Sequence, residues 1–240
     1  MNIVRKISLL GLALSVAACG SVEVPTRNAP FESLPDTSLS APQGYLQLKT
    51  EAVPAPVAAI NQSNGLILGQ SPVSVNSVII RVPRSLKVSE ANRYLPRGDI
   101  VWREDPIGDR HAQVQKIFED AVLVGVTPLT GPVKVDVDVQ VLRFHALTEK
   151  ARYTTGGVHS ITFEMALKHP ETGELLVPVR TVRADLDGFG GQQALQAEAR
   201  GLTQKVRISN HLAEVIRQEL SNPEGYKNAS LGFYQLLNNL

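Results

Sequence analysis

The sequence predicts an α+β fold, a two-layer sandwich in which two helices pack on a small mixed or antiparallel sheet. Valine alternates with polar residues over 133–141, as in a strand with one buried face. Apolar residues recur with helical spacing over 114–122. The elements follow one another in the order β-α-β-β-β-α. Amphipathic helices and strands in this order can cover each other's apolar faces, so we expect one domain.

The first predicted strand is Val78–Val82, which ends at a proline. A short apolar segment at 99–102 follows and leads into a turn at Asp105-Pro106. Asp109 is a suitable N-cap for a helix that reaches about Leu123. The apolar positions of this helix are Val114, Ile117, Phe118, Ala121 and Val122.

The strand at 133–141 has valine at every odd position and a polar residue at every even one, so we expect one buried and one solvated face. Leu142 and Phe144 are apolar at even positions, and this change of phase predicts a β-bulge at Leu142. Residues 159–168 repeat the alternation. With a turn at 171–174 they form a predicted hairpin with residues 175–186.

Pro178 in the last strand predicts an edge position or a bulge, because proline lacks the amide hydrogen of a central strand. A single long helix, Gln192–Leu220, is predicted next, and Asn222-Pro223 ends it. Its expected apolar stripe is Leu195, Ala199, Leu202, Val206, Leu212, Val215, Ile216 and Leu220.

The charge of the chain is balanced, with 24 basic and 23 acidic residues and a net charge of +1. This balance argues against nucleic acid as a partner. The chain has one cysteine, Cys19, which excludes an internal disulfide framework and a cysteine-based zinc site.

Residues 1–18 have the organisation of a secretory signal peptide, with Arg5 and Lys6 before an uncharged run. The run is shorter than the roughly 20 apolar residues of a spanning helix. Its end, Val16-Ala17-Ala18-Cys19, resembles the lipobox of bacterial lipoproteins. The resemblance implies a diacylglycerol thioether on the sulfur of Cys19 and a further acyl chain, such as palmitate, on its amine. The alternative is a plain signal peptide with a cysteine near the cleavage site by chance.

Gly20 and Ser21 follow the cysteine, and no aspartate stands at the second position. By resemblance to Gram-negative lipoproteins, this implies the periplasmic face of the outer membrane rather than the inner membrane.

The remaining chain divides into three segments. Residues 19–75 are rich in proline and serine and predict a tether with a loosely ordered approach to the domain. Within them, 44–48 and 65–68 are apolar enough to dock as short strands. Residues 76–222 form the predicted α/β domain, and 223–240 form a C-terminal tail.

Two segments carry a further resemblance. Asp99–Arg110 (DIVWREDPIGDR) and Arg143–Gly157 (RFHALTEKARYTTGG) are similar to segments of an uncharacterised proteobacterial lipoprotein family, over roughly residues 75–220. That family has no assigned activity, so the resemblance implies location and fold but no chemistry. In architecture the chain also resembles auxiliary lipoprotein components of ABC-type transport systems and the LPS-assembly lipoprotein, a likeness that does not fix function.

Candidate catalytic and metal-binding groups have simpler structural interpretations. No pair of histidines has the i, i+4 spacing of a helical metal site, which favours structural or surface roles. Asp136 and Asp138 share a strand face, where we expect them to be solvated. Gly188–Gly191 precedes a helix and is a candidate anion cradle, but it lacks the P-loop lysine and is interpreted as a flexible turn. The histidines are His111, His145, His159, His169 and His211.

The most prominent candidate surface is the stretch Arg93–Arg110 with the single tryptophan, extended by the segment Arg143–Gly157. A tryptophan among alternating charged residues is typical of protein–protein contacts. The candidate residues of this surface are Trp102, Arg103, Arg110, Arg143, Arg152 and Tyr153. The alternative is a tryptophan packed under its own loop.

We therefore expect a non-enzymatic, membrane-anchored lipoprotein that binds envelope proteins, with no cofactor beyond the covalent lipid and no metal. It would be an auxiliary part of a transport or assembly complex. The alternatives are a carrier of lipid or another apolar ligand and, third, an envelope hydrolase.

Overall fold

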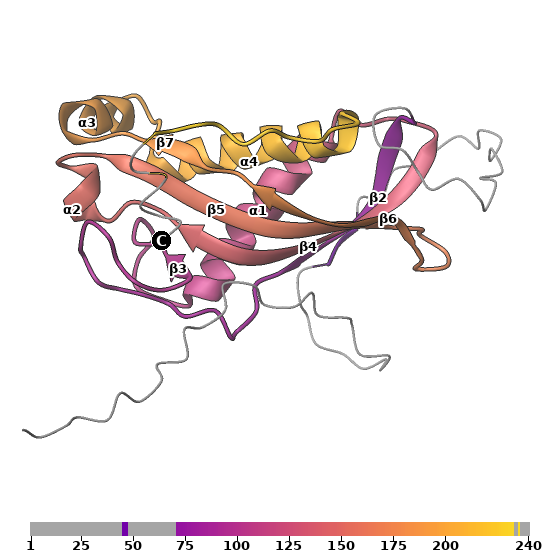
Figure 1. Cartoon of the computed structure of the whole chain (residues 1–240), viewed down its shortest axis with the longest axis horizontal. Coiled ribbons are helices and arrows are strands. Elements are labelled where there is room, and N and C mark those ends of the chain that lie inside the picture. Colours follow the sequence, from indigo (N-terminus) through magenta and orange to yellow (C-terminus); the bar gives the residue numbers. More distant parts are fainter. Residues whose placement is uncertain (1–44, 48–70, 233–234, 236–240) are drawn as a thin grey trace, which may run out of the picture.

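The computed structural model describes residues 45–47, 71–232 and 235 (Figure 1). The predicted signal peptide, the lipobox with Cys19 and most of the tether lie outside these residues. The described part is an α+β sandwich, which confirms the predicted fold class. Its sheet has the strand order β1-β2-β4-β5-β6, with β3 paired to β4 and β7 paired to β5.

The sheet is mixed because β2 (Val73–Arg81) runs parallel to β4, whereas β5 and β6 are antiparallel. β2 begins five residues before the predicted strand and includes residues of the segment predicted as tether. β1 (Tyr45–Gln47) pairs antiparallel with β2, which confirms the short strand expected within 44–48. The segment 65–68 lies outside the described residues.

β4 (Val133–His145) is the central strand. The pairing register with β5 shifts between Val141 and Arg143, which confirms the bulge predicted at Leu142. The expectation that the even-numbered face is solvated is wrong at Asp138 and Gln140, because both are buried. Asp138 lies between cations from the two neighbouring strands, and their side chains shield it from water.

The hairpin is formed by β5 (Gly157–Lys168) and β6 (Leu175–Arg183), and Pro178 lies on the edge strand as predicted. The predicted strand 175–186 is divided, because β7 (Leu186–Gly188) is a separate element that pairs with the start of β5. The buried Asp185 lies at this division.

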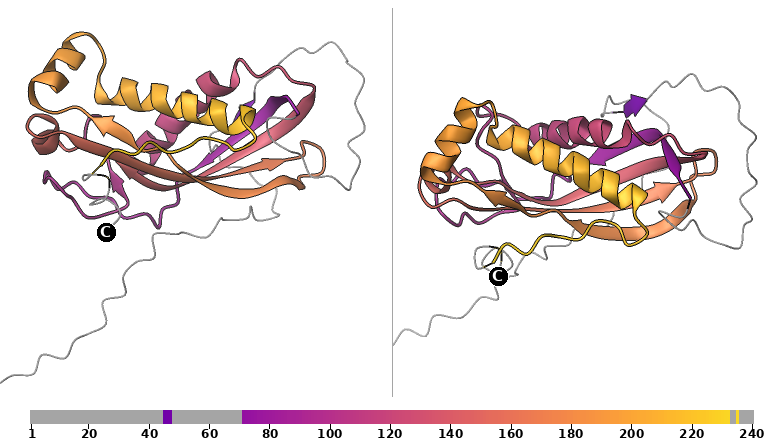
Figure 2. Two further views of the ribbon diagram at one scale, coloured as in Figure 1. Left: turned by 45° about the horizontal axis from the view of Figure 1, so that its top comes forward. Right: turned by 90° about the horizontal axis from the view of Figure 1, so that it is seen from above.

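Asp185 also holds the described part of the C-terminal tail. Its carboxylate accepts hydrogen bonds from the side-chain amides of Asn228 (3.0 Å) and Gln235 (2.7 Å) and from the backbone of Ile161 (3.3 Å). The tail therefore returns along the β6–β7 junction after the last helix (Figure 2).

Two long helices cover one face of the sheet (Figure 2). α1 (Arg110–Val126) begins at the predicted cap, where Asp109 accepts a hydrogen bond from the backbone of Ala112. α1 packs beside α4 (Gln204–Ser221), and Gly125 allows the close approach. A Cβ atom at Gly125 would lie 2.5 Å from the backbone oxygen of Ala213.

The single helix predicted over 192–220 is two helices, α3 (Gly191–Ala199) and α4. Gly201 has φ +77°, a left-handed conformation that ends a helix, and Thr203 caps α4 by accepting a hydrogen bond from Val206. Because α3 turns away at one end of the molecule (Figure 1), part of the predicted apolar stripe is exposed. The exposed members are Leu195, Ala199, Leu202 and Val206.

The core lies between the sheet and helices α1 and α4. Its largest rings meet edge to face, with ring centroids 5.5 Å apart for Phe118 and Phe163 and 5.7 Å apart for Trp102 and Phe144. Within the described residues, no helix has both the length and the apolar character that a membrane span requires.

Candidate functional site

A cleft of about 200 Å³ opens at one end of the sheet. One wall is the loop between β2 and β3 (Ile100–Val101), and the other is the chain from the end of β4 through α2 (Glu149–Arg152) to the start of β5. The loop between β2 and β3 passes below α2 in Figure 1. The lining is mainly apolar and comprises Tyr94, Leu95, Pro96, His145, Ala146, Leu147, Thr148, Thr155, Gly156, Gly157 and Val158.

The loop wall of the cleft is held at both of its ends. On one side the hydroxyl of Thr148 donates to the backbone oxygen of Arg93 (2.8 Å), and the backbone of Lys150 donates to the side chain of Asn92 (2.9 Å). On the other side His145 contacts the oxygen of Gly98. Between these ties, Tyr94 and Leu95 remain 47% and 54% exposed. The cleft is thus a fixed concave surface with apolar side chains at its mouth.

The hydrogen bonds of His145 assign its tautomer. Nε2 lies 2.7 Å from the backbone oxygen of Gly98, which only accepts, so Nε2 carries the hydrogen. Nδ1 lies 3.0 Å from a guanidinium nitrogen of Arg143, which only donates, so Nδ1 accepts. This arrangement requires a neutral imidazole, and it gives His145 a structural role in holding the loop.

Trp102 is not part of a surface. It is 0% exposed and packs in the core, and its indole nitrogen donates to Asp105 at 2.8 Å. The prediction that it anchors a partner is therefore wrong, and the alternative of a tryptophan under its own loop is correct. The reason is that β3 pairs with β4, which draws the residue after β3 under the loop.

Arg110 and Arg103 are also committed to internal contacts. Arg110 is buried and binds Glu90 (2.6 Å), and this hydrogen bond lowers the pKa of Glu90. Arg103 binds Glu149 (2.6 Å) and the backbone oxygen of Glu90, and the hydrogen bond to Glu149 raises the pKa of Arg103. Their guanidinium groups fasten the loop before α1 to the rest of the domain.

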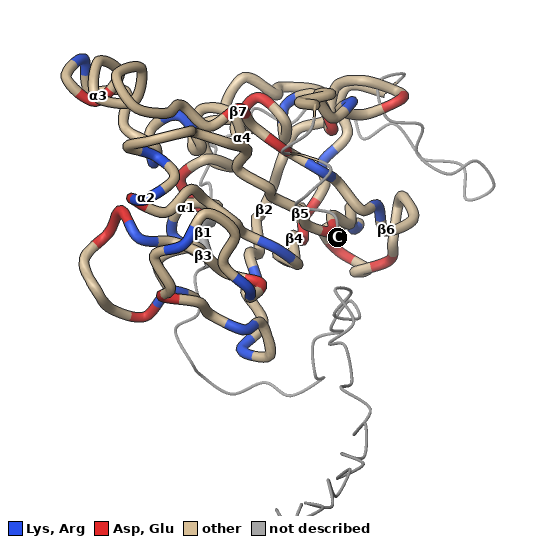
Figure 3. Tube along the Cα trace, turned by 60° about the vertical axis from the view of Figure 1, so that its left-hand side comes forward, with Lys and Arg blue, Asp and Glu red and all other residues tan. Residues whose placement is uncertain are grey.

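Arg152 pairs with Glu104 (2.8 Å) and Glu198 (3.2 Å), and so joins α2, α3 and the loop after β3. Tyr153 stands beside it and is 41% exposed. Of the six predicted surface residues, only Tyr153 is exposed, and Arg143 and His145 contact each other at the cleft. Figure 3 shows basic and acidic residues alternating along the loops around β3, in keeping with this network.

The histidines are separate from one another. His159 is 1% exposed, and burial lowers its pKa to about 3, so it is neutral. Burial also lowers the pKa of His211. His111 contacts the backbone oxygen of Leu86, and His169 lies at the β5–β6 turn. Among the described residues, no group of histidine, cysteine, aspartate and glutamate side chains could hold a metal ion.

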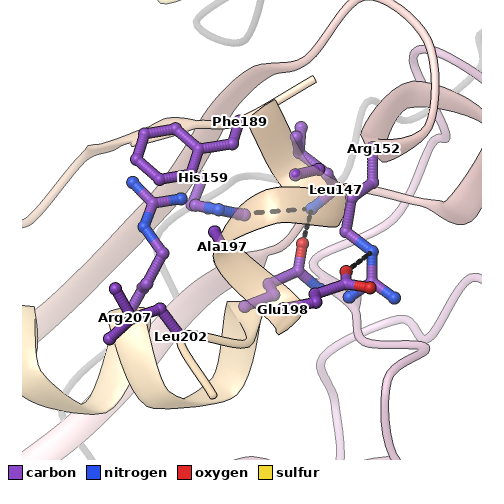
Figure 4. A pocket seen from close by; sticks show the side chains of 10 residues that line it. Leu147, Arg152, His159, Phe189, Ala197, Glu198, Leu202 and Arg207 are labelled. Atoms are coloured by element: carbon purple, nitrogen blue, oxygen red, sulfur yellow. Dashed lines mark hydrogen bonds and ion pairs between the residues drawn. The ribbon is translucent and has the colours of Figure 1, made fainter. Parts of the chain in front are cut away.

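A small cavity of about 10 Å³ adjoins His159, which is room for about one water molecule (Figure 4). The backbone amide of Leu147 is shared between Nδ1 of His159 (3.3 Å) and the side-chain oxygen of Gln204 (3.1 Å). Arg207 stacks over the ring of Phe189, 3.4 Å from its centroid, and burial lowers the pKa of Arg207. The cavity is too small for an organic substrate.

The two remaining candidates have structural roles. Asp138 binds Arg81 (2.8 Å) and Lys168 (2.7 Å). Asp136 accepts a hydrogen bond from Asn76, so the two carboxylates serve separate contacts. In the Gly188–Gly191 turn, a Cβ atom at Gly190 would overlap the backbone of the α2–β5 turn. Glycine is needed there for packing, which supports the interpretation as a turn.

The candidate surface predicted over residues 93–110 includes Tyr94 and Leu95, but sequence reasoning named neither of them and did not identify the cleft. Two adjacent apolar residues between Arg93 and Pro96 were the available signal, since such a pair in a charged loop is either buried or offered to a partner. The opposite wall comes from residues some fifty positions later, which only the fold brings near.

Comparison with known proteins gives a family. A family of unknown function (DUF6778) matches residues 73–236. No curated protein sequence matches the chain.

Three solved structures show a distant likeness. A Xanthomonas campestris protein of the DUF330 family is 12% identical with a TM-score of 0.39, covering 67% of this chain and 87% of its own. A "putative lipoprotein" from Caulobacter crescentus is 13% identical with a TM-score of 0.31, covering 45% and 80%. The PelC dodecamer from Paraburkholderia phytofirmans is 14% identical with a TM-score of 0.29, covering 70% and 97%. With TM-scores below 0.5, these likenesses carry no information on function.

Proposed function

The chain belongs to this family of unknown function, DUF6778, and we propose that it is a non-enzymatic lipoprotein of the cell envelope that binds a partner protein. In this proposal a covalent lipid on Cys19 anchors it to the membrane, at the periplasmic face of the outer membrane. The folded domain is then an auxiliary component of a transport or assembly complex.

The lipobox supports the anchor. Val16-Ala17-Ala18-Cys19 stands at the end of a signal peptide, and Cys19 is the one cysteine of the chain. Each buried methylene of an acyl chain contributes about 0.8 kcal/mol, and two or more chains give stable attachment where one does not.

The use of the ionisable groups supports a non-catalytic role. Catalysis by a general base or a nucleophile needs a reactive side chain that is open to substrate. Arg103, Arg110 and Arg152 bind carboxylates within the domain. His159 is buried and neutral, and its cavity holds about one water molecule. These groups therefore stabilise the loops and are not presented to a substrate.

The apolar cleft is the observation that carries the binding role. Its loop wall is fixed by hydrogen bonds at both ends, and Tyr94 and Leu95 stand exposed at its mouth. A preformed surface of this kind loses little conformational entropy when a partner binds. Aromatic and apolar side chains beside a concave pocket are typical anchors of protein–protein contacts.

The volume of the cleft favours a protein partner over a carried lipid. Pockets for drug-sized ligands are about 300–1,000 Å³, whereas this cleft is about 200 Å³. It suits one or two side chains of a partner better than an acyl chain. Carriage of a small apolar ligand is the second candidate function, and the apolar lining is the observation that favours it.

Site-specific photocrosslinking tests the partner. The full-length lipoprotein would carry benzoylphenylalanine in place of Leu95, or in place of Leu175 as the control. Leu175 lies on β6 and is also 54% exposed. We expect a defined envelope protein to be crosslinked from position 95 and not from position 175, and to be lost with Cys19→Ala.

Incorporation of labelled palmitate tests the anchor separately. We expect the label in the parent chain and not in Cys19→Ala. Crosslinks that are equal from both positions would contradict the role of the cleft. An apolar small molecule recovered by mass spectrometry from the purified protein, with no crosslinked protein, would support the carrier instead.

A further inference from the structure

The loop wall of the cleft carries two arginines without an acidic partner in the part of the chain that the structure describes. Arg93 and Arg97 are exposed and flank the three lining residues at 94–96. A third cation, Lys150, places its ammonium group 4.8 Å from the centre of the Tyr94 ring, again without a carboxylate partner among the described residues. Two exposed arginines are thus adjacent in sequence to the lining residues of the cleft, and Lys150 lies over one of them, Tyr94.

The neighbouring arginines behave differently. Arg84, Arg103, Arg110 and Arg152 each pair with a carboxylate of the domain. Within the described residues, Arg93, Arg97 and Lys150 form no such pair, although internal ion pairs are frequent in this region. A surface with local excess of one charge attracts and orients a partner of the opposite charge.

We propose that the partner presents an acidic peptide segment with an apolar side chain. This inference rests on the proposed function and names the chemistry of its partner. The apolar side chain enters the cleft beside Leu95, and the carboxylates of the segment lie against Arg93, Arg97 and Lys150. The volume of about 200 Å³ limits the inserted part to one or two side chains. The charges around it select the flanking residues.

Binding of short capped peptides tests this chemistry. The probe is acetyl-Asp-Glu-Leu-Phe-Asp-Glu-amide. One control, acetyl-Lys-Arg-Leu-Phe-Lys-Arg-amide, reverses the charge, and the other, acetyl-Asp-Glu-Ser-Asn-Asp-Glu-amide, lacks the apolar pair. Titration into the full chain with Cys19→Ala, followed by NMR, is expected to show binding of the probe alone. Raising the salt concentration should weaken that binding, since exposed charges are screened.

Paired variants of the protein locate the site. The double variant Arg93→Glu and Arg97→Glu should bind the probe about tenfold more weakly, because two attractions become repulsions. Arg183→Glu reverses an exposed charge on β6 and should leave binding unchanged. Leu95→Asn should weaken binding about fivefold by removing apolar contact, whereas Leu175→Asn should not.

All of these positions are exposed, so folding should be retained, and circular dichroism verifies this. Equal binding of the charge-reversed peptide, or full binding by the Arg93→Glu and Arg97→Glu double variant, would overturn the inference. Preferential binding to phosphatidylglycerol vesicles over the peptide would overturn it as well and would identify a membrane as the partner.

The inference and the proposed function fail differently. If the envelope crosslink at position 95 persists in the Arg93→Glu and Arg97→Glu double variant, the partner is not acidic, and the proposed function stands. If no envelope protein is crosslinked but the acidic peptide binds the cleft, the preference of the cleft for acidic peptides stands, whereas its assignment to an envelope partner fails with the proposed function.

Discussion

The buried neutral His159 should make the domain sensitive to mild acid. Burial lowers the pKa of His159 to about 3 in the folded protein, against about 6.5 in an unfolded chain. Between these values the unfolded chain binds a proton that the folded protein does not. The contribution of the neutral His159 to the stability of the domain is therefore fully present above pH 6.5, and it is lost as the pH falls towards 3.

The size of the effect follows from the two pKa values. Each pH unit within this window changes the free energy of unfolding by up to about 1.4 kcal/mol. Acidification from pH 7.5 to pH 5 should thus remove about 2 kcal/mol through His159 alone. This is a large share of the 5–15 kcal/mol that holds a typical domain folded.

Urea unfolding at pH 7.5 and at pH 5 isolates this contribution. The measurement compares the Cys19→Ala chain with the same chain that also carries His159→Gln. Glutamine does not titrate, and His211, whose pKa is also lowered by burial, remains in both proteins. We expect His159→Gln to be less stable at pH 7.5 but to lose about 2 kcal/mol less on acidification. An equal loss in both proteins would refute the assignment of a buried, neutral imidazole.

Three further changes test the packing. Gly125→Ala should lower the free energy of unfolding by about 1–3 kcal/mol, because its Cβ atom would meet the backbone of α4; Val124→Ala, at an exposed site, should be nearly neutral in the same urea titration. Asp138→Asn should lower stability by about 3 kcal/mol by removing a buried carboxylate charge that binds Arg81 and Lys168, and a thermal melt like that of Asp120→Asn, an exposed control, would contradict this. Gly201→Ala should cost about 1 kcal/mol, measured by urea titration, because φ is +77°.

Much of the architecture could be read from local patterns. The alternating valines of β4, the bulge at Leu142 and the Asp109 cap of α1 are all as predicted. Each depends on residues a few positions apart, whose sterics and hydrogen bonds act within one element. The break between α3 and α4 also had a local signal, Gly201 followed by Thr203, but the continuing apolar spacing obscured it.

The candidate site was not readable in the same way. Trp102 in a charged loop has the composition of a surface anchor, and only the pairing of β3 with β4 places it in the core. The ion pairs of Arg103 with Glu149 and of Arg152 with Glu104 join residues more than forty positions apart. Sequence alone cannot tell which opposite charges will meet at that separation.

The sequence by itself determined the order and type of the main elements and the apolar faces that form the core, because short-range periodicity specifies them. It also carries the lipobox at Cys19 as a prediction. The tertiary structure decided which charges are neutralised inside the domain and which remain at the cleft. Long-range packing of two segments of the chain creates that cleft. Tyr94 and Val158 line it together although they are far apart in the sequence, and no local pattern predicts that they meet.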